Sequence, residues 1–177
     1  MTVRVICLHG PESTGKSTLA AALGQALDAE VVPEYGRLWC EAHGPETSMA
    51  DLITIATEHR TRIHAAWGRA LEEGRAWLVL DTDPVMTAVW ARVLYGRPDP
   101  FFDEIENTAD LYVVPDIDLP WVNDGLRYLG GEAERQRFMA LSIAELEQRH
   151  LPYAIVSGEG PRRLEMALAK VKGLTAA

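Results

Sequence analysis

The sequence predicts an α/β protein, a three-layer α/β/α sandwich around a five-stranded parallel sheet. Short apolar runs alternate with longer segments of helical periodicity, which is the pattern of βαβ units. A glycine-rich phosphate-loop motif joins the first apolar run to the first helical segment. The 177 residues suit one domain, and neither internal repeats nor low-complexity segments divide them. We therefore expect a single P-loop domain over residues 1–177.

The strands and helices follow from the spacing of apolar residues and from local start and stop signals. Ser48 is a suitable N-cap for a long helix that Gly74 ends, and Pro84 suits the first turn of the next helix. The apolar stripe expected on the long helix comprises Leu52, Ala56, His59, Ile63, Trp67 and Leu71. The expected strands cover residues 3–8, 30–33, 76–80, 111–115 and 153–157. The other expected helices cover residues 16–27, 84–94, 132–149 and 162–172, and a polar loop covers about 116–131.

The composition argues against several kinds of binding partner and indicates the cellular compartment. The net charge of −9 argues against a protein that binds duplex nucleic acid, because such proteins carry a basic excess. The two cysteines, Cys7 and Cys40, lack the spacing of a zinc site. The N-terminus lacks a signal-peptide layout, and no apolar stretch approaches the roughly 20 residues that span a bilayer. We expect a reduced cytoplasmic protein that binds neither nucleic acid nor membrane; its oligomeric state is not indicated.

The segment from Gly10 to Ser17 matches the phosphate-loop pattern G-x-x-x-x-G-K-[ST] at every fixed position. Glycines let the backbone aim several N–H groups at phosphate oxygens, and the helix that begins here adds the positive end of its dipole. Lys16 is expected to bind the β- and γ-phosphates, and the Ser17 hydroxyl to ligate Mg²⁺. The motif predicts a bound nucleoside triphosphate without deciding between ATP and GTP. The loop residues expected to contact it are Gly10, Glu12, Ser13, Thr14, Gly15, Lys16, Ser17 and Thr18.

Three carboxylates follow predicted strands and are expected at the ligand-binding edge of the sheet. Asp81 ends the third strand, where a Walker B carboxylate holds Mg²⁺ directly or through water, and Asp83 lies two residues further. Glu34 follows the second strand. A kinase that acts on a hydroxyl benefits from a carboxylate that accepts its proton, so all three are candidate catalytic bases. The alternative for each is a capping or turn carboxylate, which suits Asp83 before Pro84 especially well.

The polar loop at 116–131 is the expected lid. Trp121 is poorly explained by core packing there and suits stacking on a flat, cationic ring; the alternative is that it anchors the loop on the domain. Arg127, with either Arg135 or Arg137, is expected to neutralise charge on the transferring phosphoryl group. The alternative for these arginines is a solvated helix face.

The sequence also gives expectations for three other residues near the predicted site. Tyr35 and Arg37, beside Glu34, are expected to share the pocket of the phosphoryl acceptor. Trp90 stands at helical spacing from Met86 and is expected in the core.

The loop at 157–162 leads from the last strand into the closing helix. In a sheet of this kind it lies near the base of the bound triphosphate, so Arg162 is expected to lie against that base. A plain structural turn is the alternative.

Four segments together resemble one family. They are GPESTGKST, VVPEYGR, LDTD with the following VWARVLYG, and DLPWVNDGLR. In combination they resemble the nicotinamide riboside kinase domain of NadR-type bacterial NAD-salvage proteins, which are P-loop kinases of the AAA-like ATPase family. The resemblance runs from about Val5 to Arg163.

This resemblance implies a kinase-type sheet of order 2-3-1-4-5, with ATP and Mg²⁺ as co-substrates. It implies phosphorylation of the 5′-hydroxyl of nicotinamide riboside to nicotinamide mononucleotide. The resemblance does not separate ribose binding, metal binding and proton transfer among the three carboxylates. The residues that it implicates are Lys16 and Ser17 for ATP–Mg²⁺, Asp81, Asp83 and Glu34 for ribose, metal or proton transfer, and Trp121 and Asp124 for the nicotinamide side.

One departure keeps other functions open. NadR-type proteins usually carry a nucleotidyltransferase domain ahead of the kinase, whereas this sequence starts at the first kinase strand. We therefore also consider a stand-alone kinase, an excised domain or a relative with a changed acceptor. The alternatives in function are a kinase of another nucleoside or of a nucleoside monophosphate, and a P-loop ATPase without a small-molecule acceptor. The acidic charge weighs against the ATPase.

Overall fold

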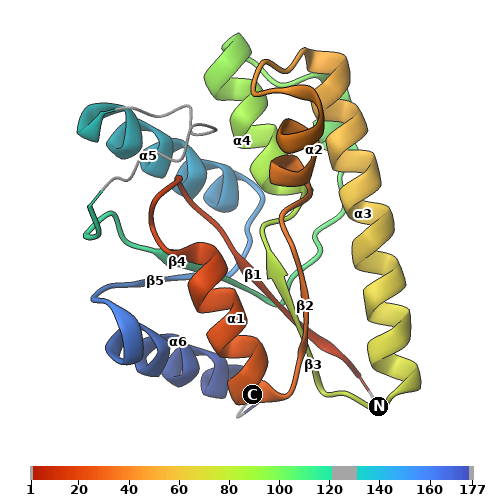
Figure 1. Ribbon diagram of the computed structural model, residues 1–177, viewed down its shortest axis with the longest axis vertical. Coiled ribbons are helices and arrows are strands. Elements are labelled where there is room, and N and C mark those ends of the chain that lie inside the picture. The colour runs from red at the N-terminus through yellow and green to blue at the C-terminus, as the bar shows by residue number, and fades with distance from the viewer. Residues whose placement is uncertain (1, 121–130, 176–177) are drawn as a thin grey trace.

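The structure, a computed structural model, describes residues 2–120 and 131–175 and contains a five-stranded sheet (Figure 1). The strand order is β2-β3-β1-β4-β5, and all neighbouring strands run parallel. Both the parallel sheet and the order 2-3-1-4-5 are thereby confirmed. The strands are β1 (Arg4–Leu8), β2 (Glu30–Val32), β3 (Trp77–Asp81), β4 (Leu111–Pro115) and β5 (Tyr153–Val156).

Helices cover both faces of this sheet, as the sequence predicts. Helices α1 (Lys16–Leu27) and α6 (Gly160–Thr175) pack together on one face. The opposite face is covered by α3 (Met49–Glu72), α4 (Pro84–Tyr95) and α5 (Glu132–Gln148). The remaining described elements are α2 (Tyr35–His43), which contacts α3, and a short 3₁₀ helix, η1 (Pro100–Glu104).

The central strand β1 shows why its sequence is apolar at nearly every position. Val5 and Cys7 point into the core beneath α3, α4 and α5, whereas Ile6 and Leu8 point into the core beneath α1 and α6. Successive side chains of a strand face opposite sides, so a strand covered on both faces needs apolar residues throughout.

The predicted caps of the two helices behind the site are confirmed. Ser48 forms a capping box with Asp51: the Asp51 N–H donates to Ser48 Oγ at 3.2 Å, and the Ser48 N–H donates to the Asp51 carboxylate at 2.8 Å. The Asp83 carboxylate accepts the N–H groups of Val85 and Met86 at the start of α4. These side chains satisfy backbone donors that have no partner within the helix.

The structure differs from the sequence prediction in three places. The sequence did not predict α2 or η1, because α2 is short, buries no residue fully and therefore has no clear apolar stripe. The expected stripe on α3 holds only as far as Ile63. Beyond it Ala66 and Ala70 are buried, whereas Trp67 is 42% exposed and Leu71 is 41% exposed. Small residues face the sheet there because they let the end of α3 approach it closely.

The pairing register brings the functional segments to one edge of the sheet. Leu8, the last residue of β1, pairs with Asp81 of β3 and with Val113 of β4. Asp81 therefore lies beside the strand end from which the phosphate loop starts. Because the three parallel strands end at the same edge of the sheet, the residues that follow them lie close together without long loops.

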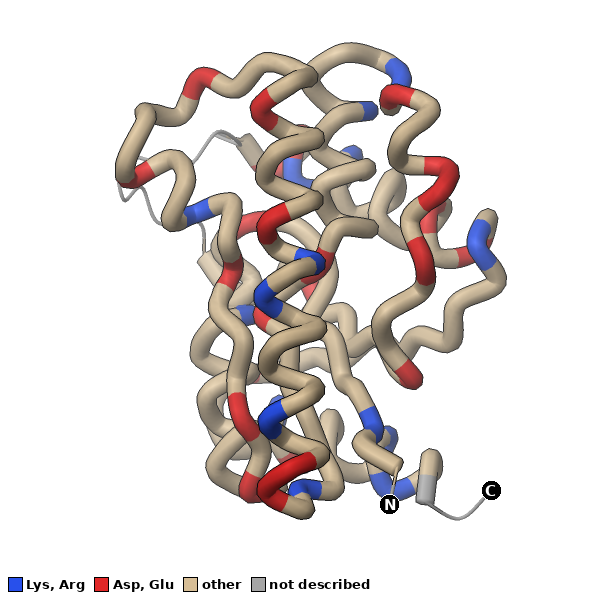
Figure 2. Tube along the Cα trace, turned by 90° about the vertical axis from the view of Figure 1, so that its right-hand side faces the viewer, with Lys and Arg blue, Asp and Glu red and all other residues tan. Residues whose placement is uncertain are grey.

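Charge is interspersed on the side of the molecule that α3 forms. Figure 2 shows Lys and Arg positions mixed with Asp and Glu positions there, without a basic stripe of the kind that duplex binding requires. Within the described part of the chain, no helix combines the length and apolar character needed to cross a membrane.

The close approach of α1 to β2 yields a stability prediction. A Cβ atom on Gly24 would lie 2.4 Å from Val31 Cγ2 and 3.3 Å from the Ala29 carbonyl oxygen. We expect Gly24→Ala to lower the free energy of unfolding by about 1–3 kcal/mol, because the stiff Val31 side chain must move. Chemical denaturation monitored by circular dichroism measures this change.

Gly68→Ala is the matched control. A Cβ on Gly68 of α3 would meet nothing within 4 Å, so this change should stabilise by about 0.5–1 kcal/mol through helix propensity alone. Equal stabilisation by both substitutions would contradict the close packing of α1 on β2.

Candidate active site

The loop between β1 and α1 has the backbone geometry of a phosphate cradle. Gly10, Ser13 and Gly15 have positive φ angles of 122°, 58° and 77°. A Cβ on Gly15 would lie 3.2 Å from Leu119 Cδ1, and one on Gly10 would lie 3.4 Å from Val114 Cγ1. Both positions therefore favour glycine by conformation, and at Gly15 a side chain would also be crowded by Leu119. The turn places the amino end of α1 at the cavity described below.

Lys16, the first residue of α1, is held by the loop itself. Its side chain is buried, and Nζ donates to the Pro11 carbonyl oxygen at 2.8 Å. The Thr14 hydroxyl donates to the same oxygen at 2.9 Å. The ammonium thus lies within the loop, where a phosphate can replace the carbonyl as its partner.

Two buried arginines from distant helices support the loop. Arg163 of α6 donates from Nη1 to the Thr14 carbonyl oxygen and from Nη2 to the Asp118 carboxylate. Arg135 of α5 donates from Nη2 to the Ser13 carbonyl oxygen at 3.3 Å. Sequence reasoning missed Arg163 and favoured Arg162, which is exposed in the structure. The adjacent pair of arginines after a tight loop was the only signal, and it could not decide which one turns inward.

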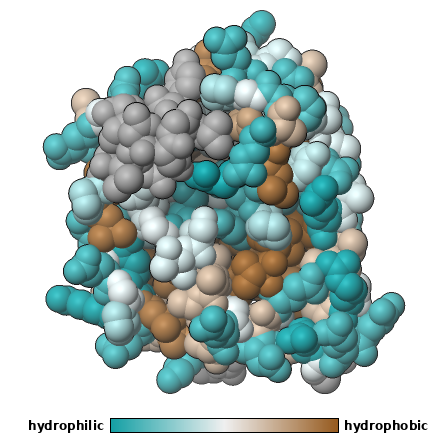
Figure 3. Space-filling view, in the orientation of Figure 1, coloured by the Kyte–Doolittle hydropathy of each residue, from teal (hydrophilic) through white to brown (hydrophobic). Residues whose placement is uncertain are grey.

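A cavity of about 240 Å³ joins this loop to the helices opposite it. Figure 3 shows a hollow near the middle of the molecule, with hydrophilic side chains around its centre. Residues 12–18 form one side of the cavity. The other side is formed by α2, α3, α4 and the segment between α2 and α3. The structure therefore places a phosphate cradle and a second pocket in one continuous space.

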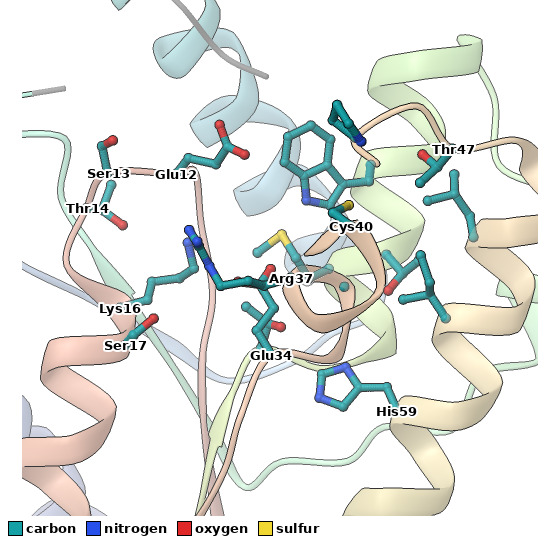
Figure 4. Close-up of a pocket in the computed structure, with 18 of the residues that line it drawn as sticks. Glu12, Ser13, Thr14, Lys16, Ser17, Glu34, Arg37, Cys40, Thr47 and His59 are labelled. Atoms are coloured by element: carbon teal, nitrogen blue, oxygen red, sulfur yellow. The ribbon is translucent and has the colours of Figure 1, made fainter. Parts of the chain in front are cut away.

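Glu34 lies between the two halves of this cavity (Figure 4). It is the N-cap residue of α2, although its side chain makes no capping hydrogen bond. Burial raises the pKa of the Glu34 carboxyl, Lys16 opposes that rise, and Asp81 adds to it. A carboxylate with a raised pKa accepts a proton more readily. Arg37, one turn further along α2, is exposed and lines the same cavity, as the sequence predicted.

Asp81 has the features of a metal-binding carboxylate. It is only 5% exposed, and its Oδ1 has no hydrogen-bond partner among the described residues. Buried carboxylate oxygens are normally paired, so this one suits a cation. Ser17, the second residue of α1, lines the cavity, whereas Asp81 is not among the lining residues. Among the described residues no three His, Cys, Asp or Glu side chains gather into a metal site.

Asp83 lies outside the cavity lining and serves α4. Besides its two capping bonds, it accepts the Tyr112 hydroxyl at 2.6 Å and the Thr108 hydroxyl at 2.5 Å. It is fully buried, and burial raises its pKa. The structure thus favours the capping alternative for Asp83 over contact with substrate.

The wall opposite the loop is apolar and includes a residue that the sequence assigned to the core. Trp90 packs against the core, as the sequence predicts, and it also lines the cavity, as does Met86. Trp90 also packs on Phe138 of α5, with ring centroids 4.6 Å apart. An indole is large enough to contact the core with one side and a cavity with another. The other apolar lining residues include Leu52, Ile55 and Leu94.

One of the expected acceptor residues lies away from the cavity. Tyr35 does not line the cavity; it packs on the core and carries the Arg62 guanidinium 4.5 Å from its ring centroid. Trp121, Asp124 and Arg127 lie outside the described residues, so their expected roles stay predictions.

Polar side chains that sequence reasoning did not single out complete the second pocket. His59 of α3 is 1% exposed and lines the cavity. Cys40, Thr47 and Thr87 line it as well. The helical pattern had placed His59 within an apolar stripe, and nothing in the sequence shows that this stripe borders a cavity.

The cradle, the buried Asp81 beside it and the parallel sheet of order 2-3-1-4-5 define a P-loop protein that binds a nucleoside triphosphate. The chain belongs to the AAA domain family, which matches residues 5–163.

Individual known proteins show a more specific similarity than the family does. The chain is 32% identical over 163 residues to the trifunctional NAD biosynthesis/regulator protein NadR of Escherichia coli (strain K12). The match covers 89% of this chain but 39% of NadR, so the chain spans about two fifths of that protein. A crystal structure of a NadR protein in complex with NR has a TM-score of 0.78 and 26% identity, covering 99% of this chain and 52% of that one. Thymidylate kinase from Ehrlichia chaffeensis, at TM-score 0.71 and 14% identity over 98% of this chain and 100% of that one, shares the kinase-type P-loop fold.

The placement of Asp83 yields a prediction that separates structure from catalysis. An Asn side chain offers one carbonyl and one amide, so Asp83→Asn cannot accept both hydroxyl bonds and both capping bonds. We expect it to lower the free energy of unfolding by about 2–4 kcal/mol, with the kcat of the folded fraction within about threefold of wild type. Asp99→Asn, which removes one charge at the cap of η1, is the matched control and should cost about 1 kcal/mol or less. Loss of kcat by about 100-fold with unchanged stability would restore a catalytic role for Asp83.

Proposed function

We propose that this chain is a nicotinamide riboside kinase. It transfers the γ-phosphoryl group of ATP to the 5′-hydroxyl of nicotinamide riboside, giving nicotinamide mononucleotide and ADP in NAD salvage. The observation that carries this proposal is the single cavity shared by the phosphate loop and a mostly apolar second pocket. The likeness to NadR, one structure of which contains NR, supports nicotinamide riboside as the acceptor.

The arrangement of charges supports a direct transfer. Glu34 accepts the proton of the 5′-hydroxyl, and the oxygen forms a bond to the γ-phosphorus. The bond from this phosphorus to the oxygen bridging the β- and γ-phosphates breaks, and ADP leaves. Lys16 and the N–H groups of the loop stabilise the negative charge on the transferring group. Glu34 is the best placed base of the three carboxylates, because it lines the cavity and its pKa is raised.

Mg²⁺ is part of the proposal. Ser17 and Asp81 would hold it, and Asp81 Oδ1, which has no hydrogen-bond partner in the described part of the chain, supports this assignment. When bound, Mg²⁺ neutralises phosphate charge and helps to orient the triphosphate.

The proposed roles of the lid residues and of the residue at the nucleotide base are based on the sequence alone. We propose that residues 116–131 form a lid in which Trp121 and Asp124 contact the nicotinamide ring and Arg127 contacts the phosphoryl group. Arg162 is proposed to lie against the base of ATP. We further propose that residues 1–177 act as one kinase domain and that the reaction takes place in the cytoplasm.

An acceptor panel tests the function. The purified chain is incubated with ATP and Mg²⁺ plus nicotinamide riboside, a deoxynucleoside or a nucleoside monophosphate, and products are separated by chromatography. We expect nicotinamide mononucleotide as the main product. Turnover of another acceptor without this product would overturn the assignment of the substrate.

Lys16→Ala tests the role of the cradle. Its ammonium lies within the loop that is proposed to bind the phosphates, so the change should lower kcat by at least about 100-fold while circular dichroism shows an intact fold. Lys170→Ala, an exposed lysine of α6, is the matched control and should retain full activity. Activity of Lys16→Ala within about tenfold of wild type would show that the cradle does not act in transfer.

A further inference from the structure

His59 is a buried polar side chain that the proposed mechanism does not use. It lies on the same face of α3 as Leu52 and Ile55, at spacings of three and four, and all three line the cavity. Its Nε2 is buried and has no hydrogen-bond partner among the described residues. A buried imidazole nitrogen without a partner is costly to maintain, so a ligand that supplies the missing bond is a natural explanation.

The surroundings of His59 indicate which part of a ligand its Nε2 atom could contact. The neighbouring wall of the cavity is formed largely by the apolar side chains of Leu52, Ile55, Met86 and Trp90. In such a pocket, a few placed polar groups fix the orientation of a ligand. Figure 4 shows the His59 ring pointing from α3 toward the end of the cavity where Glu34 lies. Glu34 is the proposed partner of the 5′-hydroxyl, so the sugar of an acceptor would lie at this end.

His59 is uncharged at neutral pH. Burial lowers its pKa to about 4, and the Arg62 guanidinium on the same helix lowers it further in the same direction. A neutral imidazole can donate from one nitrogen and accept at the other. It therefore offers a hydrogen bond without placing a positive charge next to a cationic pyridinium ring.

We propose that His59 binds a ribose hydroxyl of the acceptor nucleoside through Nε2 and so helps to select the acceptor. This proposal rests on the proposed kinase function and assigns one contact within it. The contact is to the acceptor only, because His59 is on the far side of the cavity from the residues of the phosphate loop.

Steady-state kinetics with nicotinamide riboside tests the contact. We expect His59→Phe to raise the KM for the acceptor by roughly tenfold or more while the KM for ATP stays within about twofold. His59→Asn keeps a donor and an acceptor and should recover part of the loss. His64→Phe makes the same change on the exposed face of α3 and should leave both KM values unchanged. Thermal unfolding of each variant identifies a loss that comes from the fold alone.

Sugar analogues identify the hydroxyl. For wild type, removal of the 2′- or the 3′-hydroxyl should lower kcat/KM, and in His59→Phe the loss at one of these positions should disappear. An unchanged acceptor KM in a folded His59→Phe, or full losses at both positions in that variant, would overturn the proposal. If wild type turns over a different nucleoside of the panel, the kinase assignment fails separately, and the same series on that nucleoside still tests His59.

Discussion

The phosphate loop depends on two buried guanidinium groups that bind its carbonyl oxygens. Arg163 reaches Thr14 from α6, and Arg135 reaches Ser13 from α5. Both helices are remote in sequence from the loop, so the loop geometry is set by the whole domain rather than by its own residues. Carbonyl oxygens engaged in this way are directed to protein donors instead of opposing a bound phosphate. The position of Lys16, and with it the donor half of the cavity, follows from this support.

The two halves of the cavity differ in the physical work that they do. The donor half is polar, with a lysine and backbone N–H groups at a helix start, as required by a highly charged triphosphate. The other half is mostly apolar and contains the uncharged His59, which suits a nucleoside. Glu34 lies at the junction, where its raised pKa favours proton transfer. This division of polarity within one space is what a transfer between two unlike substrates requires.

The sequence predicted the features that depend on neighbouring residues. The phosphate loop, the strands, the cap at Ser48 and the cap at Asp83 all follow from local patterns and are confirmed. The second pocket could not be predicted, because it is formed where α2, α3 and α4 pack together. The apolar spacing along each helix therefore gives no sign that Trp90 and His59 border a cavity. For the same reason the sequence placed Tyr35 in the acceptor pocket, whereas Tyr35 does not line the cavity. Asp81 and Asp83 illustrate the limit, because they are only two residues apart. Asp81 Oδ1 has no hydrogen-bond partner among the described residues, whereas Asp83 accepts hydrogen bonds from Thr108 and Tyr112 within the fold.

The central claim is that one cavity holds donor and acceptor at the same time. Calorimetric titration with a bisubstrate analogue, in which the 5′-oxygen of nicotinamide riboside is joined through a phosphate chain to adenosine, tests it most directly. We expect one molecule to bind per chain, at least about 100-fold more tightly than either ATP or nicotinamide riboside alone, because linking removes the cost of bringing two ligands together. Affinity no greater than that of ATP, with nicotinamide riboside still able to bind alongside, would contradict a shared cavity.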